Sequence, residues 1–487
     1  MTILGTYGTI NWVCSQNDGF FCLDFAVCPR NAQVIYMKGH SMSLFKLGKT
    51  RIPHKKSTSG LQAVRIAPPA TVSIPMSQHI GAPATPTVKA GDTVFVGTLI
   101  GEAGGFVSAP IYSSVSGTVK KIDGYLQSSG RSVPTVIIES DGLMTPDPEI
   151  QPPSIESFAD LSAAARKCGL VGLGGAGFPT SVKLDPSKIS SIDSLILNGA
   201  ECEPYITSDT RTMLDEAEYI KSGVELFERL TDIKDIIIGI EKNKPECISK
   251  MREMFEGDGR VRVAPLPTGY PQGAEKVLIY NTTGRIIPEG GLPSDVGAIV
   301  MNVTTLATLA KYVKTGMPLV EKCVTVDGSA VSAPKNLIVP IGASIESVIE
   351  AAGGLKCEAG KILYGGPMMG VAVYSTSDPI LKNTNAITVL DKKDAAPKKE
   401  NPCIHCGRCV SICPIGLNPT VYARSMKVDD PTDRAERLSL AKINLCIECG
   451  SCSFVCPSAR PLVEFNRLAK ADLREFNAKK AKEDSKK

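Results

Sequence analysis

Two cysteine motifs near the end of the chain constrain it more than any other feature. The first starts at Cys403 and reads Cys-Ile-His-Cys-Gly-Arg-Cys-Val-Ser-Ile-Cys-Pro, and the second starts at Cys446 and reads Cys-Ile-Glu-Cys-Gly-Ser-Cys-Ser-Phe-Val-Cys-Pro. Each has the C-x2-C-x2-C-x3-C-P spacing of a [4Fe-4S] site, and in two-cluster ferredoxins the fourth cysteine of each motif ligates the other cluster. The spacing therefore predicts one cluster on Cys403, Cys406, Cys409 and Cys456, and another on Cys446, Cys449, Cys452 and Cys413.

Other uses of these cysteines fit the spacing less well. Structural zinc sites use pairs of Cys-x2-Cys rather than triplets closed by Cys-x3-Cys-Pro. The start of the chain lacks the basic and apolar segments of an export signal, so disulfide pairing is not expected either. His405 lies inside the first motif, where it either tunes a cluster through a hydrogen bond to sulfur or faces solvent without a role. We favour the second interpretation, and the chain as a whole is predicted to carry single electrons.

The composition excludes several other classes of protein. Of the 487 residues, 43% are hydrophobic and 21% are charged, as in an ordinary globular protein. The net charge of +4 and the 5% of aromatic residues give no case for nucleic-acid binding. No apolar run approaches the roughly 18 residues of a membrane span. Any association with a membrane is therefore expected to run through partner proteins.

The N-terminal part divides into an extension and a β-rich module. Residues 1–42 are interpreted as an over-extended gene start or a tail without fixed structure. Residues 43–148 contain short alternating runs separated by Gly, Asp and Pro, which predicts a small barrel or sandwich. The module resembles the barrel-sandwich hybrid of lipoyl and biotinyl carrier domains, but no lysine lies between Ala103 and Gly117 to carry such a group. We therefore interpret it as structural.

A glycine-rich loop marks the next domain, an α/β domain predicted at residues 154–318. The loop contains Gly172, Gly174, Gly175 and Gly177 and is followed by Lys183. Such glycines let a backbone approach a phosphate closely and point N–H groups at it. A glycine-rich loop alone is weak support for a nucleotide site, so its neighbours decide the interpretation.

The neighbouring segments alternate between strand and helix patterns. A buried-strand pattern at 194–199 ends in Asn198 and leads into Glu201 and Glu203. Helices are predicted at 158–168, 212–230 and 245–255, with a further strand at 235–239. Polar side chains at the carboxyl end of a strand in an α/β sheet lie where ligands bind. The loop and these residues therefore predict one binding site.

Two further motifs complete an order that resembles a known family. Tyr270 precedes Glu275 in Tyr-x-x-Gly-x-Glu, and Asn302 precedes Thr305 in Asn-Val-x-Thr. With the glycine loop and Asn-x-x-Glu-x-Glu-Pro, they are similar to the flavin- and NADH-binding subunit of respiratory complex I. The variant Tyr-Pro-Gln-Gly-Ala-Glu-Lys and the run Gly-Gly-Pro-Met-Met-Gly at 365–370 are more similar to the C-type subunit of the Rnf complex (RnfC). This resemblance covers the chain from about Met42 onward.

The resemblance implies a role for each matching residue. The loop that holds FMN corresponds to Gly172, Gly174, Gly175, Gly177 and Lys183. The positions beside the flavin and at its phosphate end correspond to Asn198, Glu201, Asn302 and Thr305. The positions near the nicotinamide nucleotide correspond to Phe178, Glu203, Tyr270 and Glu275. Ala200 and Ala274 depart from complex I, which has carboxylates there, so individual contacts are expected to differ.

The rest of the chain completes a multidomain α/β fold. Residues 320–388 are predicted to form a β-grasp (SLBB) domain, which we interpret as a packing element. A helical two-cluster ferredoxin-like domain is predicted at 400–465 and a charged, solvated tail at 466–487. The predicted architecture is thus a lipoyl-like barrel-sandwich module, a Rossmann-like FMN/NADH domain of the complex I flavoprotein type, the β-grasp domain and the cluster domain.

The resemblance also implies a function. RnfC passes electrons between NAD(H), FMN and two [4Fe-4S] clusters, and no catalytic side chain is needed because the cofactors carry the chemistry. The implied partners are the other membrane and soluble subunits of the Rnf complex (A, B, D, E and G), with ferredoxin indirectly, which couple the electron transfer to Na+ or H+ translocation. We expect a peripheral location on the cytoplasmic side of the cell membrane. The alternatives are a soluble NADH diaphorase similar to cobalamin reductases and a non-catalytic iron–sulfur relay.

Overall fold

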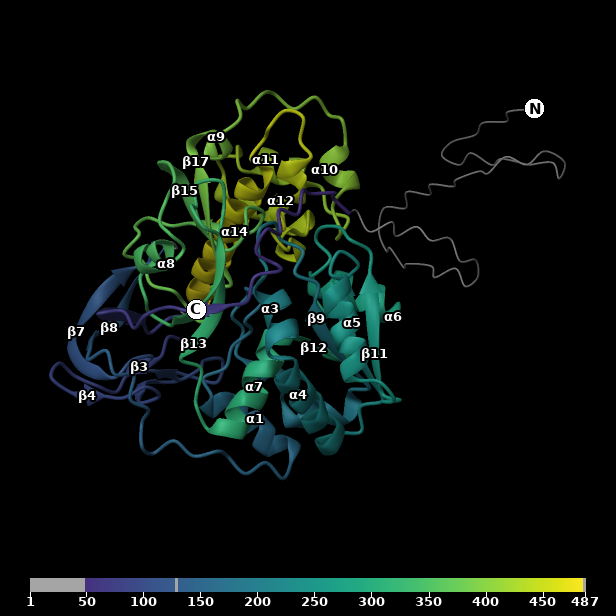
Figure 1. The fold of residues 1–487 in the computed structure, drawn as a ribbon. Helices are drawn as coiled ribbons and strands as arrows, with labels where there is room; N and C mark the ends of the chain where they lie inside the picture. The colour runs from purple at the N-terminus through teal and green to yellow at the C-terminus, as the bar shows by residue number, and fades with distance from the viewer. Residues whose placement is uncertain (1–48, 128–129, 485–487) are drawn as a thin grey trace, which may run out of the picture. The chain divides into compact units, whose positions relative to one another are not determined.

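The computed structural model describes residues 49–127 and 130–484 (Figure 1), all within the compact unit from Leu47 to Lys487. The extension predicted at residues 1–42 lies outside the described residues. Within the two described ranges, no helix is both long and apolar enough to cross a membrane. The elements form three groups built on sheets and a fourth group made of helices.

The first group is a β module with two small antiparallel sheets. One sheet has the strand order β2-β8-β7-β4 and the other has the order β3-β5-β6. Alternating residues such as Val72, Ile74 and Ile138 point inward and form one buried core. The strands are β2 (Thr71–Pro75), β3 (Thr85–Pro86), β4 (Thr93–Val94), β5 (Leu99–Glu102), β6 (Ile111–Tyr112), β7 (Gly117–Leu126) and β8 (Ser132–Ser140).

The second group is built on a parallel sheet of four strands in the order β11-β10-β9-β12. Leu195 and Leu197 face the large core with α1, α3, α4, α5 and α7, and Ile196 faces a smaller core with α6. The strands are β9 (Ser194–Gly199), β10 (Asp235–Glu241), β11 (Val261–Leu266) and β12 (Ala298–Asn302). The helices are α1 (Phe158–Lys167), α2 (Thr180–Lys183), η1 (Pro186–Ser191), α3 (Ser208–Asp215), α4 (Ala217–Leu230), α5 (Pro245–Met254), α6 (Glu275–Thr283), η2 (Pro293–Val296) and α7 (Val303–Thr315).

One helix of this group differs from its prediction. The segment predicted as a single helix at 212–230 forms two helices, α3 and α4. Glu216 separates them because its φ of −119° and ψ of 25° are not helical. The break turns α3 toward the end of β9, where it becomes part of the candidate site described below.

The third group is a six-stranded sheet in the order β1-β14-β13-β17-β15-β16, packed against α8. Strand β1 pairs in parallel with β14, although its residues precede the β module in the chain. Asn336 Nδ2 also donates to the Thr58 carbonyl at 2.9 Å. Residues before the β module therefore belong to this sheet, unlike the predicted assignment of residues from 43 onward. The elements are β1 (Val64–Arg65), β13 (Glu321–Asp327), β14 (Lys335–Pro340), α8 (Ile345–Ala351), β15 (Ala359–Tyr364), β16 (Val371–Ala372) and β17 (Ala386–Asp391).

The fourth group is helical and carries the cysteine motifs. Its helix α14 is continuous across residue 466, where the sequence predicts a domain boundary. Ala469 and Leu473 on α14 are buried in a core with Tyr422 and Leu438, so the first half of this helix is packed rather than solvated. The elements are α9 (Lys392–Ala395), α10 (Arg408–Ser411), α11 (Pro419–Ser425), α12 (Pro431–Leu440), η3 (Ile443–Leu445), α13 (Ser451–Phe454) and α14 (Leu462–Asp484).

A buried lysine joins the first three groups. Lys382 is 1% exposed, and its Nζ donates to the carbonyls of Pro110 at 2.6 Å and Gly169 at 2.7 Å. Burial lowers the pKa of Lys382 to about 7. A neutral amine still has two N–H donors, which matches the two carbonyls that it contacts.

Candidate functional site

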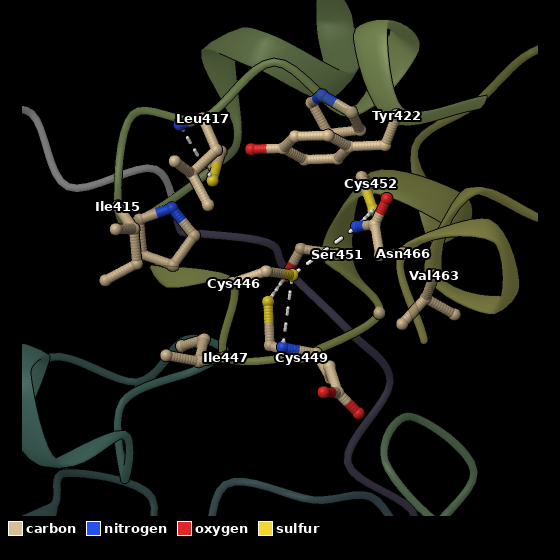
Figure 2. Close-up of a pocket in the computed structure, with 15 residues that line it drawn as sticks. Ile415, Leu417, Tyr422, Cys446, Ile447, Cys449, Ser451, Cys452, Val463 and Asn466 are labelled. Carbon is tan, nitrogen blue, oxygen red and sulfur yellow. Dashed lines mark hydrogen bonds between the residues drawn. The ribbon is translucent and has the colours of Figure 1, made fainter. Parts of the chain in front are cut away.

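Two cavities in the helical group divide the motif cysteines into two sets. The inner cluster cavity (Figure 2) is lined by Cys413, Cys446, Cys449 and Cys452. The outer cluster cavity is lined by Cys403, Cys406, Cys409 and Cys456. In each set, three cysteines come from one motif and the fourth comes from the other motif, in agreement with the crossed ligand pattern of two-cluster ferredoxins.

The two cavities share one backbone design. His405 and Glu448 stand at equivalent positions of the two motifs, with left-handed φ values of 54° and 56°. The His405 N–H donates to Cys403 Sγ at 3.4 Å, and the Glu448 N–H donates to Cys446 Sγ at 3.4 Å. The side chain of His405 is exposed. Its contribution to sulfur therefore comes from the backbone, which any residue at this position supplies.

The surroundings of the thiols favour a positively charged guest. Burial raises the pKa of Cys409, Cys446 and Cys449, and it raises the pKa of Cys452 to about 12. Thiolates are stable in such a place only beside a metal. Among the described residues, no three ligand side chains converge as around a single ion. Each cavity has about 370 Å³ between its lining atoms, so both fit a cube of irons and sulfides better than one ion.

The glycine loop is a closed turn with an exposed tip. The Gly172 N–H donates to the Phe178 carbonyl at 2.8 Å, and the Gly177 N–H donates to the Gly172 carbonyl at 3.2 Å. Gly175 lies at the exposed tip, and its carbonyl accepts a hydrogen bond from Asn383 Nδ2 at 2.9 Å. Phe178 is half-buried where the loop ends. The loop is therefore preformed, and its tip is open to a ligand.

The start of helix α7 lies against this loop. Asn302 caps the helix, because its Oδ1 accepts hydrogen bonds from the N–H groups of Thr304 and Thr305. The Thr305 hydroxyl accepts the Leu173 N–H at 3.0 Å. A Cβ added at Gly174 would lie 3.1 Å from Asn302 Nδ2. The contact explains a glycine here, and a helix N-terminus beside a glycine loop suits a phosphate.

Lys183 and Glu275, both predicted site residues, are paired with each other. Lys183 Nζ lies 2.9 Å from Glu275 Oε2 and also donates to the Val300 carbonyl at 2.9 Å. Their side chains are 32% and 40% exposed. The pair thus holds a cation at the edge of the sheet, and an anionic ligand can approach it from solvent.

Asn198 fixes the loop that precedes α6. Its Nδ2 donates to the Gly273 carbonyl at 2.9 Å, and its Oδ1 accepts the Ala200 N–H at 3.2 Å. Ala200 is fully buried in the core that contains α6. A carboxylate at this position would be desolvated, which accounts for the departure from complex I at Ala200.

Glu201 is used by the fold. Its carboxylate is 2% exposed and accepts hydrogen bonds from the Asp209 N–H at 2.7 Å and the Thr210 hydroxyl at 2.6 Å, so that it caps α3. Asp209 accepts in turn from Asn302 Nδ2 at 2.8 Å. Burial and the nearby Glu201 raise the pKa of Asp209 to about 6. Asp209 therefore orients Asn302, and no motif singles it out.

Glu203 and Tyr270 lie where three groups of elements meet. Glu203 accepts the N–H groups of Met368 at 3.1 Å and Met369 at 2.8 Å, from the loop that follows β15. Burial raises the pKa of Glu203 to about 7. The Tyr270 hydroxyl donates to the Cys449 carbonyl at 2.7 Å, and Tyr270 is 1% exposed. Both residues join the α/β domain to its neighbours.

A segment that no motif marks supports these residues from behind. Lys56 Nζ donates to the carbonyls of Glu201 and Glu203, both at 2.8 Å. Thr50 and Tyr270 exchange two backbone hydrogen bonds, of 2.9 and 3.0 Å. The sequence pattern assigns this segment to the β module, because a lone lysine in a polar run carries no sign of a buried partner.

The predicted cofactor residues therefore fall into two places. One place, at the carboxyl ends of β9 and β12, gathers the glycine loop, Lys183, Asn198, Glu275, Asn302 and Thr305. The other, beside the inner cluster cavity, contains Glu203 and Tyr270. The roles of these residues toward FMN and NAD(H) stay predictions.

Comparison with known proteins gives four matches in chain order. The matching family models are an RnfC barrel sandwich hybrid domain at residues 44–143, a Nuo51 FMN-binding domain at 165–311, an SLBB domain at 323–372 and a 4Fe-4S dicluster domain at 402–459. These matches confirm the predicted fold class and the predicted cofactors FMN and [4Fe-4S]. The exact domain boundaries stay predictions.

Individual relatives match most of the chain. The C-type subunit of the Na(+)-translocating ferredoxin:NAD(+) oxidoreductase complex of Acetobacterium woodii is 46% identical over 72% of this chain and 80% of its own length. The corresponding subunit of the proton-translocating ferredoxin:NAD(+) oxidoreductase complex of Clostridium ljungdahlii is 43% identical over 76% of this chain and 81% of its own length. A crystal structure of an NAD+-reducing [NiFe]-hydrogenase is 19% identical over 65% of this chain and 63% of that chain, with a TM-score of 0.45.

Proposed function

Because the chain belongs to the RnfC family of ion-translocating ferredoxin:NAD(+) oxidoreductase complexes, we propose that it exchanges electrons between NAD(H) and the rest of such a complex. Its cofactors are FMN and two [4Fe-4S] clusters, and its partners are the other Rnf subunits. FMN, when bound, takes a hydride and releases electrons singly, which is the form that clusters accept. The protein has to hold these groups, exclude water and keep them close together.

The residues at the carboxyl ends of β9 and β12 would hold the flavin. N–H groups of the glycine loop and of α7 suit its phosphate, and Asn198 and Asn302 are already fixed by their own hydrogen bonds. Glu275 holds Lys183 in place until an anionic group of the cofactor or the substrate replaces it. Site residues that need little rearrangement lose little entropy when the ligand binds.

One contact carries the proposal. The Tyr270 hydroxyl reaches the carbonyl of Cys449, a residue of the inner cluster cavity, and Tyr270 packs with Cys449 and Ile52 in a buried cluster of side chains. The α/β domain and the inner cluster cavity are therefore in direct contact. We assign the first electron transfer from the flavin to the cluster of the inner cavity.

The outer cluster cavity is the better exit toward partner subunits. Cys406 and its neighbours from Ile404 to Arg408 are exposed, and Ile404 is 66% exposed. Small interfaces of this kind are typical of redox partners. We place this side of the subunit against the membrane-bound part of the complex, on the cytoplasmic face, with ion translocation carried out by the partners.

Anaerobic reconstitution of the full chain with iron, sulfide and FMN tests the proposal. NADH is then added stepwise while flavin absorbance and the EPR signals of the clusters are recorded. We expect flavin bleaching, about eight irons per chain and cluster signals that appear in step with the added NADH. Clusters that bind without flavin and do not respond to NADH would refute the proposal and leave an iron–sulfur relay.

A matched pair of variants tests the assigned order. Cys406→Ala, in the outer set, should leave the inner cluster reducible by NADH. Cys449→Ala, in the inner set, should stop NADH from reducing the outer cluster, although dithionite still reduces it. Reduction of the outer cluster at the wild-type rate in Cys449→Ala would show that the order is wrong.

A further inference from the structure

Asn466 on helix α14 reaches into the inner cluster cavity. It is 2% exposed, and its Nδ2 lies 3.4 Å from Cys446 Sγ and 3.9 Å from Cys452 Sγ (Figure 2). Its Oδ1 is buried and accepts no hydrogen bond from the described residues. Because an unpaired buried acceptor costs about 1–3 kcal/mol, the amide is held there for what its donor end does. The donor end faces two sulfurs that belong to one predicted ligand set.

The outer cluster cavity differs from the inner one in its donors. Its backbone supplies the His405 N–H to Cys403 Sγ, just as the Glu448 N–H serves Cys446. In the part of the chain that the structure describes, no side chain donates a hydrogen bond to the sulfurs of the outer set. In the inner set, the Leu417 N–H also donates to Cys413 Sγ at 3.3 Å. The asymmetry between the cavities is therefore mainly one of added donors on the inner side.

Charged groups around the inner cavity act in the same direction. Lys470 Nζ donates to the Cys446 carbonyl at 3.0 Å and to Glu448 Oε1 at 2.6 Å. Arg467 also pairs with Glu448, at 3.4 Å. Two cations thus share one carboxylate beside Cys446. A net positive field near a cluster favours its more negative, reduced form, as hydrogen bonds to its sulfurs do.

On the proposed function that both cavities hold [4Fe-4S] clusters, we propose that Asn466 raises the reduction potential of the inner cluster above that of the outer cluster. Asn466 is a positioning residue: it touches ligand sulfurs and takes no part in bond making. Reduction adds one electron to the inner cluster, and no bond forms or breaks. An electron from the flavin domain then rests on the inner cluster until a partner draws it through the outer one.

The test is an EPR-monitored redox titration of the reconstituted full chain with dithionite, which requires neither FMN nor NADH. Asn466→Leu removes the donor and keeps the size of the side chain. We expect the inner-cluster potential to fall by about 59 mV or more, a tenfold change in a one-electron equilibrium, and the outer-cluster potential to stay unchanged. Thr420→Val, on the lining of the outer cavity, is the matched control and should leave the inner cluster unchanged.

The two signals are assigned by repeating the titration in Cys406→Ala, which keeps only the inner cluster. Unchanged potentials in Asn466→Leu, or an equal fall of both, would overturn the inference. If Asn466→Leu loses iron from the inner cavity, Asn466→Ser, whose side chain is too short to reach either sulfur, gives the same measurement. A normal titration with no NADH response would refute only the proposed function, whereas an unchanged inner potential would refute only the role of Asn466.

Discussion

Replacing Lys382 by Met should change how the stability of the protein depends on pH. Among the residues that the structure describes, Lys382 has no carboxylate partner, and its Nζ contacts the carbonyls of Pro110 and Gly169. Burial lowers its pKa from 10.5 to about 7. Between these two pH values the unfolded chain carries a proton on this side chain that the folded chain lacks. The free energy of unfolding therefore rises with pH in this window.

The size of the effect follows from the pKa. Each pH unit between pH 7 and 10.5 adds up to about 1.4 kcal/mol. A step from pH 7.5 to pH 9.5 should therefore stabilise the contact of the three groups by about 2–3 kcal/mol in the wild type. Lys322, whose pKa burial lowers to about 8, adds a similar rise that the Lys382→Met chain retains. The difference between the two proteins isolates Lys382.

Hydrogen–deuterium exchange with mass spectrometry is the suitable assay, because a protein of several domains does not unfold in two states. Peptides around Pro110, Gly169 and Lys382 report the opening of this contact, after correction for the intrinsic pH dependence of exchange. Lys479→Met, on the exposed end of α14, is the control and should behave as the wild type. An equal rise in wild type and Lys382→Met would refute the reasoning, since the rise would then not come from this side chain.

Three further predictions follow from the site. Cys413→Ala should remove the cluster of the second motif, with loss of about four of eight irons and of the inner EPR signal; loss of the outer signal instead would contradict the crossed ligand sets. Gly174→Ala should weaken FMN binding at least tenfold, about 1.4 kcal/mol, because its Cβ would crowd Asn302, whereas Gly259→Ala, whose added Cβ meets no atom of the described residues within 4 Å, should leave fluorescence titrations with FMN unchanged. Burial raises the pKa of Glu203 from 4.5 to about 7, so stability should fall as pH rises through that window, by about 3 kcal/mol; urea unfolding of Glu203→Gln should lack this fall, and an identical fall would refute it.

The features that can be predicted from sequence are those whose cause is local. The repeated cysteine spacing predicts both cavities, because a cluster dictates where its ligands stand along the chain. The strand at residues 194–199 is predictable because a fully buried strand is continuously apolar. The glycine loop and Asn302 are predicted through a resemblance, and the structure adds the contact between them that explains it.

The features that cannot be predicted depend on partners far along the chain. Lys56 looks like a surface charge in sequence, but it is buried on carbonyls from 145 and 147 residues away. Asn466 stands in a charged stretch that predicts a solvated helix, and only the packing of α14 turns it toward Cys446. Glu203 and Tyr270 match a family motif, yet their observed partners come from the third and fourth groups of elements. No local pattern encodes such contacts.

Strand β1 has a consequence for how the protein is made. Residues around Thr58 and Val64 leave the ribosome early, but their partners Asn336 and Leu337 follow much later, and Asn336 is 278 residues beyond Thr58. At bacterial synthesis rates this delay is on the order of 15 to 60 s. For that time an unpaired strand edge is open to chaperones, proteases and other nascent chains. The segment that emerges first thus completes its sheet only after two whole domains have been synthesised.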